Sequence, residues 1–271
     1  MHDIILKRLS SLHGLSSEQE LSNFLRGLRS TARCLWKAYQ ANVVNVSYKK
    51  QTVQAAYMLR YFPHYAEVTR VALDELSMQG VLPFQEECLY VNLFGCGSAP
   101  ELCGIMQFLK NRFPRSEMLI FDLYHPESAA SFTTANDRPN RIGEASLVMF
   151  QNCLNEFPQS VHDVVTQNIL DLLRMIKCGK IMLVIDRAGY QCIVDLLSHI
   201  SSLAEEHGLA KVLIVDQDRV LDCNAILERM PRILTENLFV RKISGNEIAP
   251  DEDGLICTRR VPHHCLALQR I

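Results

Sequence analysis

After residue 80 the chain alternates short apolar runs with amphipathic stretches, and this alternation limits the possible folds more than any other feature of the sequence. Five apolar runs have the length of buried strands: residues 89–94, 118–121, 146–150, 180–185 and 211–215. Between them, the apolar spacing of helices occurs in residues 100–113, 161–176 and 191–207. This order is typical of βαβ units, so the sequence predicts an α/β fold built on a mostly parallel sheet.

Residues 1–80 are predicted to form a helical region. Ser17 and Glu20 make a capping-box pattern, and apolar residues follow at the spacing of one helix face. A second helix is predicted over 51–61, because the residue before Pro63 avoids the helical conformation. A third is predicted to end at Gly80, since glycine is common just past helix ends. The expected division is a helical region over 1–80 and an α/β domain over 81–271.

The C-terminal part is predicted to end in a strand over residues 264–271, where apolar and polar residues alternate at the start. His263 and His264 are expected to precede this strand. Residues 239–243 are its expected hairpin partner, with the acidic loop 251–254 between the two.

The composition is that of a globular protein, with 48% hydrophobic and 21% charged residues. No apolar run approaches the roughly 20 residues that a membrane-spanning helix needs. The apolar stretch near the N-terminus is too short for the core of a signal peptide. We therefore expect no membrane partner and a cytoplasmic location.

The ten cysteines are scattered and form no CxxC pair, so most are expected to be reduced core residues. Cys257, His263, His264 and Cys265 offer metal-ligand chemistry, but Cys257 lacks a close second ligand. The sequence therefore predicts no metal site.

The charge is spread unevenly. The chain carries a net charge of −2, yet residues 1–60 hold nine Lys/Arg against three acidic residues, which leaves +6 there. A solvated helix face explains such an asymmetry, and so does a basic surface for an anionic partner such as RNA.

The most informative segment is the turn at Gly95, Cys96 and Gly97, which follows the first predicted strand and opens a helix. Glycines let the backbone pass close to a ligand, and open α/β sheets bind ligands beyond the carboxyl ends of their strands. Asp122 ends the next predicted strand, 23 residues after Ala99. A carboxylate in that position can bind both ribose hydroxyls of a nucleoside.

This turn resembles motif I of the class I S-adenosylmethionine-dependent methyltransferases, and residues 121–124 resemble their second motif. The resemblance implies a Rossmann-like methyltransferase sheet with an antiparallel last strand, and S-adenosylmethionine as the cofactor. It places the turn, from Phe94 through Gly95 and Cys96 to Gly97, against the cofactor. It also implies that Asp122 binds the ribose and that Leu123 flanks the adenine.

Two positions depart from that pattern. The family often has an acidic residue where this chain has Leu93, and a third glycine where it has Ala99. Glu101, in the first helical turn, is a candidate replacement for the missing carboxylate. Its alternative role is a favourable charge at a helix N-terminus. A dinucleotide fingerprint would require glycine in place of Pro100, which favours the methyl donor.

A second candidate site follows the predicted strand at 146–150. Gln151 is a candidate cofactor-binding residue, and Asn152 and Glu156 are candidate catalytic residues, with Glu156 able to accept a proton from the acceptor. The alternative is that Asn155 caps a short helix and that Glu156 is solvated. Asp186, at the end of the next strand, is a further possible acid, unless it forms an ion pair with Arg187.

Two functions remain open from these residues. One is a methyltransferase acting on RNA or on a small metabolite, and the other is a non-catalytic binding or assembly module with the same fold. Residues 56–66, which combine arginine, proline and three tyrosines, distantly resemble a segment of the mitochondrial small-ribosomal-subunit methyltransferase-like family. That resemblance favours RNA, whereas a helix packed on the core is the alternative.

Overall fold

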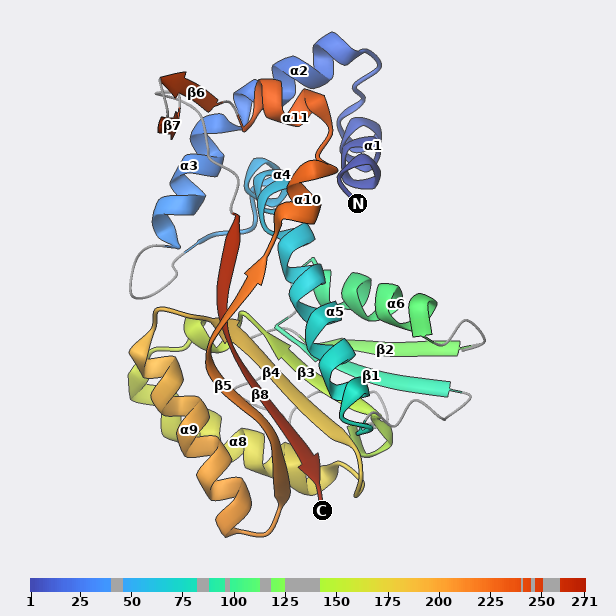
Figure 1. Ribbon diagram of the computed structural model, residues 1–271, viewed down its shortest axis with the longest axis vertical. Helices are drawn as coiled ribbons and strands as arrows, with labels where there is room; N and C mark the ends of the chain where they lie inside the picture. Colours follow the sequence, from blue (N-terminus) through green and yellow to red (C-terminus); the bar gives the residue numbers. More distant parts are fainter. Residues whose placement is uncertain are drawn as a thin grey trace. The chain divides into compact units, whose positions relative to one another are not determined.

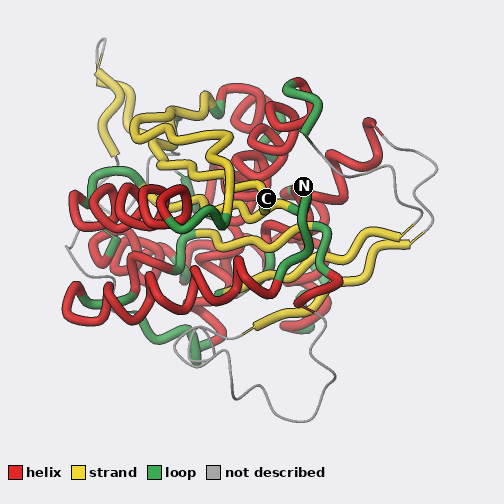
Figure 2. The backbone as a smooth tube through the Cα atoms, turned by 90° about the horizontal axis from the view of Figure 1, so that it is seen from below, coloured by secondary structure: helices red, strands yellow, loops and turns green. Residues whose placement is uncertain are grey.

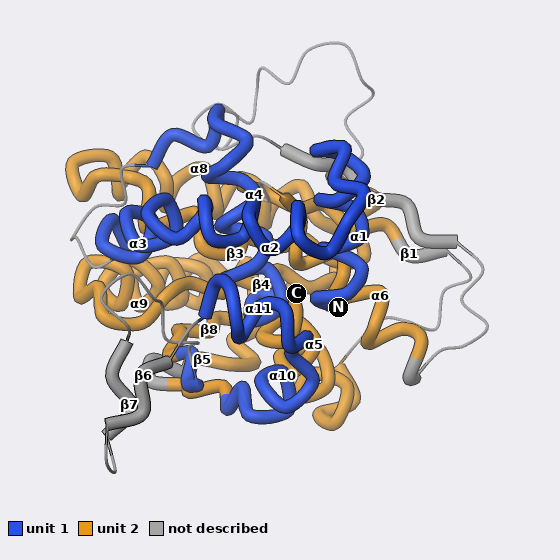
Figure 3. Tube along the Cα trace, turned by 90° about the horizontal axis from the view of Figure 1, so that it is seen from above, with its two compact units in different colours: residues 1–65, 222–261 blue, residues 66–221, 262–271 orange. Residues whose placement is uncertain are grey.

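A computed structural model describes residues 1–39, 46–81, 88–95, 98–112, 118–124, 142–239, 241–244, 247–250 and 259–271. The chain forms two compact units, coloured separately in Figure 3. Unit 1 comprises Met1–Tyr65 and Asp222–Val261, and unit 2 comprises Ala66–Leu221 and Pro262–Ile271. A late segment of the sequence therefore belongs to the same unit as the N-terminal helices. The predicted division after residue 80 stays a prediction.

Unit 1 is largely helical (Figure 1). Its described elements are α1 (His2–His13), α2 (Glu18–Gly27), α3 (Arg29–Ala38), α4 (Gln51–Arg60), α10 (Asn224–Glu228), α11 (Arg232–Asn237), β6 (Arg241–Ser244) and β7 (Glu247–Pro250). The capping box before α2 is confirmed, because Ser17 Oγ accepts a hydrogen bond from the Glu20 amide (3.2 Å). The Glu20 carboxylate in turn accepts one from the Ser17 amide (3.1 Å).

Contacts between distant parts of the sequence join α2 to α11. Arg26 Nε donates to Asn237 Oδ1 at 2.8 Å, and Arg29 Nε donates to the Asn237 carbonyl at 2.6 Å. The apolar core of unit 1 likewise combines Leu25 and Leu59 with Leu238, each fully buried. Residues 222–239 thus supply part of the core under the N-terminal helices.

Unit 2 contains a six-stranded sheet in the order β2-β1-β3-β4-β8-β5 (Figure 1). The strands are β1 (Cys88–Phe94), β2 (Met118–Tyr124), β3 (Leu147–Gln151), β4 (Ile181–Arg187), β5 (Ala210–Asp222) and β8 (Arg260–Arg270). Strand β1 pairs in parallel with β2 and β3, and β3 pairs in parallel with β4, whereas β8 runs antiparallel to β4. The predicted fold class is confirmed: the sheet is Rossmann-like, mostly parallel with an antiparallel last strand.

Helices cover both faces of this sheet. They are α5 (Phe62–Met78), α6 (Pro100–Arg112), α8 (His162–Met175) and α9 (Gln191–Glu206), with short 3-10 turns η1 (Ile142–Glu144), η2 (Leu154–Glu156) and η3 (Gln159–Val161). Right-handed crossovers place α6 on one face, and α8 and α9 on the other. Alternate strand residues such as Phe150 and Val184 pack in one apolar cluster with α8 and α9. Figure 2 shows the strands, in yellow, with helices beside them.

Gly104 sets the distance between α5 and α6. A Cβ atom at this position would lie 2.3 Å from the Ala66 carbonyl oxygen and 2.7 Å from Thr69 Cβ. Only glycine fits this contact, so α6 packs directly on α5. Both helices therefore cover the same face of the sheet.

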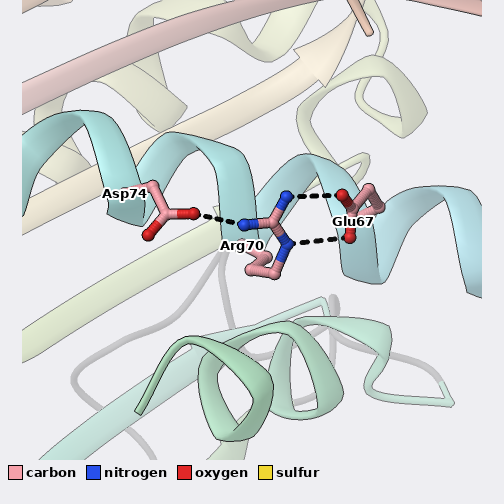
Figure 4. Close-up of polar contacts among 3 residues, drawn as sticks. All are labelled: Glu67, Arg70 and Asp74. Atoms are coloured by element: carbon pink, nitrogen blue, oxygen red, sulfur yellow. Dashed lines mark hydrogen bonds and ion pairs between the residues drawn. The ribbon is translucent and has the colours of Figure 1, made fainter. Parts of the chain in front are cut away.

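Ion pairs line the partly exposed side of α5. Arg70 lies between Glu67 and Asp74 (Figure 4), and the two carboxylates raise the pKa of its guanidinium. Glu75 pairs with Arg219 of β5 through both carboxylate oxygens. Because Arg70 is already matched by two acids, it is a poor candidate for binding an anionic ligand.

Several predicted boundaries differ from the structure. Helix α5 begins at Phe62, directly before Pro63, and a proline suits the first turn of a helix. Gly80 follows the end of this helix with φ of +71°, as predicted. Strand β6 pairs with β7 and not with the terminal strand, so the predicted hairpin was wrong. Because β8 begins at Arg260, His263 and His264 lie inside it rather than before it.

Among the described residues no helix is long and apolar enough to cross a membrane.

Candidate functional site

Several predicted site residues lie where β1 and β3 end, beside the end of β4: Phe94 closes β1 and Gly95 follows it, and Gln151 closes β3 and Asn152 follows it. These strands are parallel neighbours, so their carboxyl ends share one edge of the sheet. We call the described residues 95, 98 and 99 the β1 turn and residues 152–156 the β3 turn. The register pairs Phe94 with Phe150 and Gln151 with Ile185, which brings the two turns next to each other.

Gly95 holds the two turns in direct contact. Its φ is +66°, and an added Cβ atom would lie 2.3 Å from Cys153 Cβ and 2.9 Å from Cys153 Sγ. Ala99 also has a positive φ, 55°, a conformation that costs a residue with a Cβ atom about 1–2 kcal/mol. Cys96 and Gly97 lie outside the described residues, so their predicted roles stay predictions.

Strand β2 carries the two predicted nucleoside-binding residues beside β1. Asp122 pairs with Asn92 in the register, and Leu123 pairs with Leu93. The strand continues to Tyr124, so Asp122 comes two residues before its end rather than at it. The predicted contacts of Asp122 and Leu123 with a cofactor stay predictions.

Two side chains next to the β1 turn lie in the core. Phe94 is 1% exposed and stacks on Phe150 with ring centroids 4.7 Å apart. Leu93, at the position where the resembling family often has an acid, is fully buried. A cofactor contact by Phe94 would therefore come from its backbone.

Glu101 is buried in the first turn of α6. Its side chain is 3% exposed, and Oε2 has no hydrogen-bond partner among the described residues. Burial raises the pKa of this carboxyl from an ordinary 4.5 to about 8, so it is mostly protonated at neutral pH. The raised pKa reduces the charge that Glu101 can offer at the helix end at neutral pH.

The start of the β3 turn is tied to two neighbouring elements. Gln151 is buried, and its side-chain carbonyl accepts a hydrogen bond from the Thr69 hydroxyl of α5 at 2.5 Å. Asn152 has φ of +51°, and its amide donates to the Ile185 carbonyl of β4 at 2.8 Å. The turn therefore leaves β3 in a left-handed conformation, held between α5 and β4.

Asn155 and Glu156, at the end of the β3 turn, are both withdrawn from solvent. Asn155 is 5% exposed, and neither Oδ1 nor Nδ2 of its side-chain amide has a partner among the described residues. Its interpretation as a helix cap was therefore wrong. Glu156 is half-buried, and burial raises its pKa, so it is not the solvated residue of the alternative interpretation. Two polar groups are thus held in an apolar setting.

Asp186 is the second-last residue of β4 and is completely buried. Its Oδ2 accepts from the amides of Leu154 (3.0 Å) and Asn155 (3.3 Å), and its Oδ1 accepts from the amide of Arg187 (2.7 Å). Burial raises the pKa of this carboxyl to about 7, although the three amides oppose the shift. Within the described part of the chain it forms no ion pair, so the pairing considered with the Arg187 side chain is absent.

Three carboxyl groups act on the pKa of the Cys153 thiol. The pKa of this thiol lies well above its ordinary value because of burial and because of negative charge on Asp186, Glu156 and Glu101. None of these three acids forms a salt bridge within the ranges that the structure covers. Within the described residues this edge therefore offers carboxyl oxygens that are withdrawn from solvent, and a positively charged ligand would favour their ionised form.

Sequence reasoning missed Cys153, Asn155 and the backbone-binding role of Asp186. Each depends on a contact between strands that are distant in sequence. Among the described residues no group of His, Cys, Asp and Glu could hold a metal ion. Cys257, the weakest member of the metal-ligand set considered above, lies outside them.

Comparisons of the sequence with protein-family models and with curated proteins find no match. Among solved structures, an O-methyltransferase family protein from Burkholderia thailandensis is 12% identical, over 93% of this chain and 71% of that chain, with a TM-score of 0.41. The citrinin polyketide synthase CMeT domain is 12% identical, over 91% and 68%, with a TM-score of 0.41.

The N-methyltransferase NodS from Bradyrhizobium japonicum WM9, in complex with S-adenosyl-L-homocysteine, is 10% identical, over 89% of this chain and 98% of that chain, with a TM-score of 0.36. At such identities and scores, the fold assignment rests on the strand order and strand directions of the sheet itself.

Proposed function

We propose that this chain is an S-adenosylmethionine-dependent methyltransferase that acts on RNA or on a small metabolite. The observation that carries the proposal is the Glu101 carboxyl group. It is buried next to a left-handed glycine turn, and its Oε2 lacks a partner in the described part of the chain. A buried polar atom without a partner is costly unless a ligand supplies one.

The residues present fit this cofactor. Glu101 offers an acceptor for the amino group of the methionine portion. It would replace the acidic residue that the family often has at the position of Leu93. Gly95 and Gly97 would lie against the cofactor backbone, Asp122 would bind the ribose hydroxyls, and Leu123 would flank the adenine. When bound, S-adenosylmethionine supplies a methyl group on a sulfonium centre.

Residues of the β3 turn would serve the acceptor. Methyl transfer needs in-line approach, and holding the two reactants together with water excluded can supply most of the rate. Asn152 would orient the acceptor, and Glu156 would take up the proton that a nitrogen or oxygen acceptor loses. Its raised pKa suits that role, because a base works best when its pKa lies near the working pH.

Calorimetry with S-adenosylhomocysteine tests the proposed cofactor site. Because the Glu101 carboxyl must lose its proton to hold an amino group, affinity should rise with pH and level off above about 8. Glu101→Gln should lower the affinity about tenfold and remove the part of the pH dependence that is centred near pH 8, since a bond to a charged group is lost. Glu206→Gln, on an exposed end of α9, should change neither. No binding to the wild-type chain would refute the proposal.

The α3–α4 surface of unit 1, by which we mean Trp36, Lys37, Lys49 and Lys50, favours RNA as the acceptor or as a partner. No Asp or Glu occurs between Glu20 and Glu67, a stretch that holds seven Lys/Arg. Lys37, Lys49 and Lys50 are exposed, and Trp36 is 40% exposed. A hydrogen bond of 2.5 Å between the Tyr39 and Tyr48 hydroxyls brings the end of α3 next to residues 49 and 50.

A chain of aromatic rings begins at Tyr48, the residue before Lys49 in the sequence. Tyr48 contacts Tyr57 edge to face, and Tyr57 contacts Tyr61 and Tyr65, with ring centroids 5.6 to 6.2 Å apart. Among the described acids of unit 1, Glu236 pairs with Arg232 on α11. Cations attract the phosphates of single-stranded nucleic acid, and aromatic rings stack on its bases.

Filter binding of a single-stranded RNA over a range of salt concentrations tests this partner. Affinity should fall with ionic strength, and replacing both Lys49 and Lys50 with alanine should reduce the slope of that fall, by about 0.7 per lost phosphate contact. Replacing Lys177 and Lys211 of unit 2 is the matched control. If the wild-type chain does not retain RNA even at low salt, a small-molecule acceptor is favoured.

The second candidate function is a non-catalytic binding or assembly module. The observation in its favour is Leu93, which fills the family's frequent acidic position with a fully buried apolar side chain. Such a protein would bind S-adenosylhomocysteine weakly or not at all, and Glu101→Gln would alter its stability alone. Stability and affinity measured on that one variant separate the two functions.

A further inference from the structure

The Asp186 carboxylate accepts hydrogen bonds from two backbone amides of the β3 turn, those of Leu154 and Asn155. These amides have no acceptor within the turn itself. The first amides of any helical turn have no acceptor inside it. Here the residue before η2, Cys153, provides no side-chain cap. Leu154 and Asn155 are 1% and 5% exposed, so water cannot readily replace the missing acceptor. Asp186 Oδ2 accepts from both amides.

The β3 turn also packs against the β1 turn. Cys153 precedes the two capped amides, and its Cβ and Sγ fill the space beside Gly95, where an added Cβ atom would lie 2.3 Å from Cys153 Cβ. The Asn152 amide adds a bond to the Ile185 carbonyl, one residue before Asp186. A displacement of the β3 turn would therefore move Cys153 into or away from Gly95.

We propose that Asp186 is a positioning residue, which caps the β3 turn from strand β4 and, through Cys153, fixes Gly95 for the cofactor. Asp186 itself touches no reacting atom in this scheme. The inference rests on the proposed function only in taking Gly95 as part of the cofactor site. The capping contact stands on the hydrogen bonds and burial of the described residues.

Asp186→Asn tests the proposal, because it keeps the shape of the side chain and removes its charge. The amide proton resonances of Leu154 and Asn155 should move upfield, since they lose charge-assisted hydrogen bonds. The affinity for S-adenosylhomocysteine should fall on the order of tenfold, the usual effect of a lost bond to a charged group. Asp195→Asn, an exposed aspartate of α9, is the matched control and should leave both unchanged.

A measurement on the wild-type chain covers the case in which Asp186→Asn does not fold. The carboxyl carbon resonance of Asp186 and the amide resonances of Leu154 and Asn155 should titrate with one common midpoint. Glu156 and Cys153 of the β3 turn are titratable groups nearby, and His264 lies opposite Asp186 on β8, so the carboxyl carbon itself must be followed. Separate midpoints would overturn the capping role.

The outcomes separate this inference from the proposed function. Unchanged amide resonances in Asp186→Asn overturn the proposal, and so do shifted resonances with an affinity equal to that of the control. Shifted resonances together with weaker binding support it. If the wild-type chain binds no S-adenosylhomocysteine, the proposed function and the link to the cofactor both fail, whereas the amide resonances still decide whether Asp186 holds the turn.

Discussion

The β1 turn and the β3 turn lie at the same edge of one sheet, yet they are held in place by different means. The β1 turn depends on a missing side chain, because Gly95 leaves room for Cys153. The β3 turn depends on side chains that are present, since Asp186 and Thr69 bond to its backbone and to Gln151. A site can thus be shaped at one point by close packing and at the next by buried hydrogen bonds.

The largest effect is expected from Gly95→Ala. The new Cβ atom would both strain a backbone at φ of +66° and collide with Cys153, which should cost about 2–5 kcal/mol of unfolding free energy. Gly208→Ala is the control, because Gly208 has φ of +61° with nothing within 4 Å of the added atom. That variant should lose only about 1–2 kcal/mol to strain. Equal losses in urea denaturation would show that packing against Cys153 adds nothing.

The next prediction concerns the buried carboxyl that follows the β1 turn. With a folded-state pKa of about 8 against an ordinary 4.5, Glu101 keeps a proton in the native chain that the unfolded chain has lost. Stability should therefore decrease as pH rises from about 4.5 to 8, by at most about 1.4 kcal/mol per pH unit. Asp186 adds a decrease of the same sign between its ordinary 3.8 and about 7.

Glu101→Gln should remove the first of these contributions, most visibly between pH 7 and 8, where Asp186 no longer contributes. Unfolding free energies at pH 5, 6, 7 and 8 provide the measurement, with Glu206→Gln as control. An unaltered pH slope in Glu101→Gln would mean that the native carboxyl is ionised.

Thr69→Val addresses the polar contacts of the β3 turn. Losing the hydroxyl leaves the buried Gln151 carbonyl with one bond fewer, which should cost about 1–3 kcal/mol. Thr166→Val is the matched control, since the buried Thr166 hydroxyl has no partner among the described residues. Its replacement should be neutral or stabilising by calorimetric melting. Equal effects at the two positions would show that the hydrogen bond from Thr69 to Gln151 does not stabilise the protein.

The smallest effect is expected from Ala99→Gly. Because Ala99 adopts φ of 55°, glycine should relieve strain, offset by the greater freedom of the unfolded chain, and the net gain should be within about 1 kcal/mol. The same exchange at Ala204, inside α9, should destabilise by about 1 kcal/mol. A loss of stability at both positions would argue against a strained β1 turn.

Features that depend on neighbours in the sequence could be predicted. Apolar runs predicted the strands of the main sheet, and the Ser17–Glu20 pattern predicted the start of α2. Gly95 directly follows β1, as predicted for a turn at the carboxyl end of a parallel strand. Contacts between distant residues could not. Nothing local indicates that Asn237 bonds to Arg26, 211 residues away, or that Asp186 caps a turn 32 residues before it. Such partners follow from strand order, which periodicity alone does not contain.

Strand β8 has a consequence for how the chain is made. It follows every other strand in sequence, yet it lies between β4 and β5 in the sheet. During synthesis, β4 and β5 emerge from the ribosome without the strand that joins them, and each keeps an open edge that can pair with another chain. The sheet can close only after residues 260–270 have been translated. A chain interrupted before Arg260 should therefore aggregate rather than fold into a smaller version of unit 2.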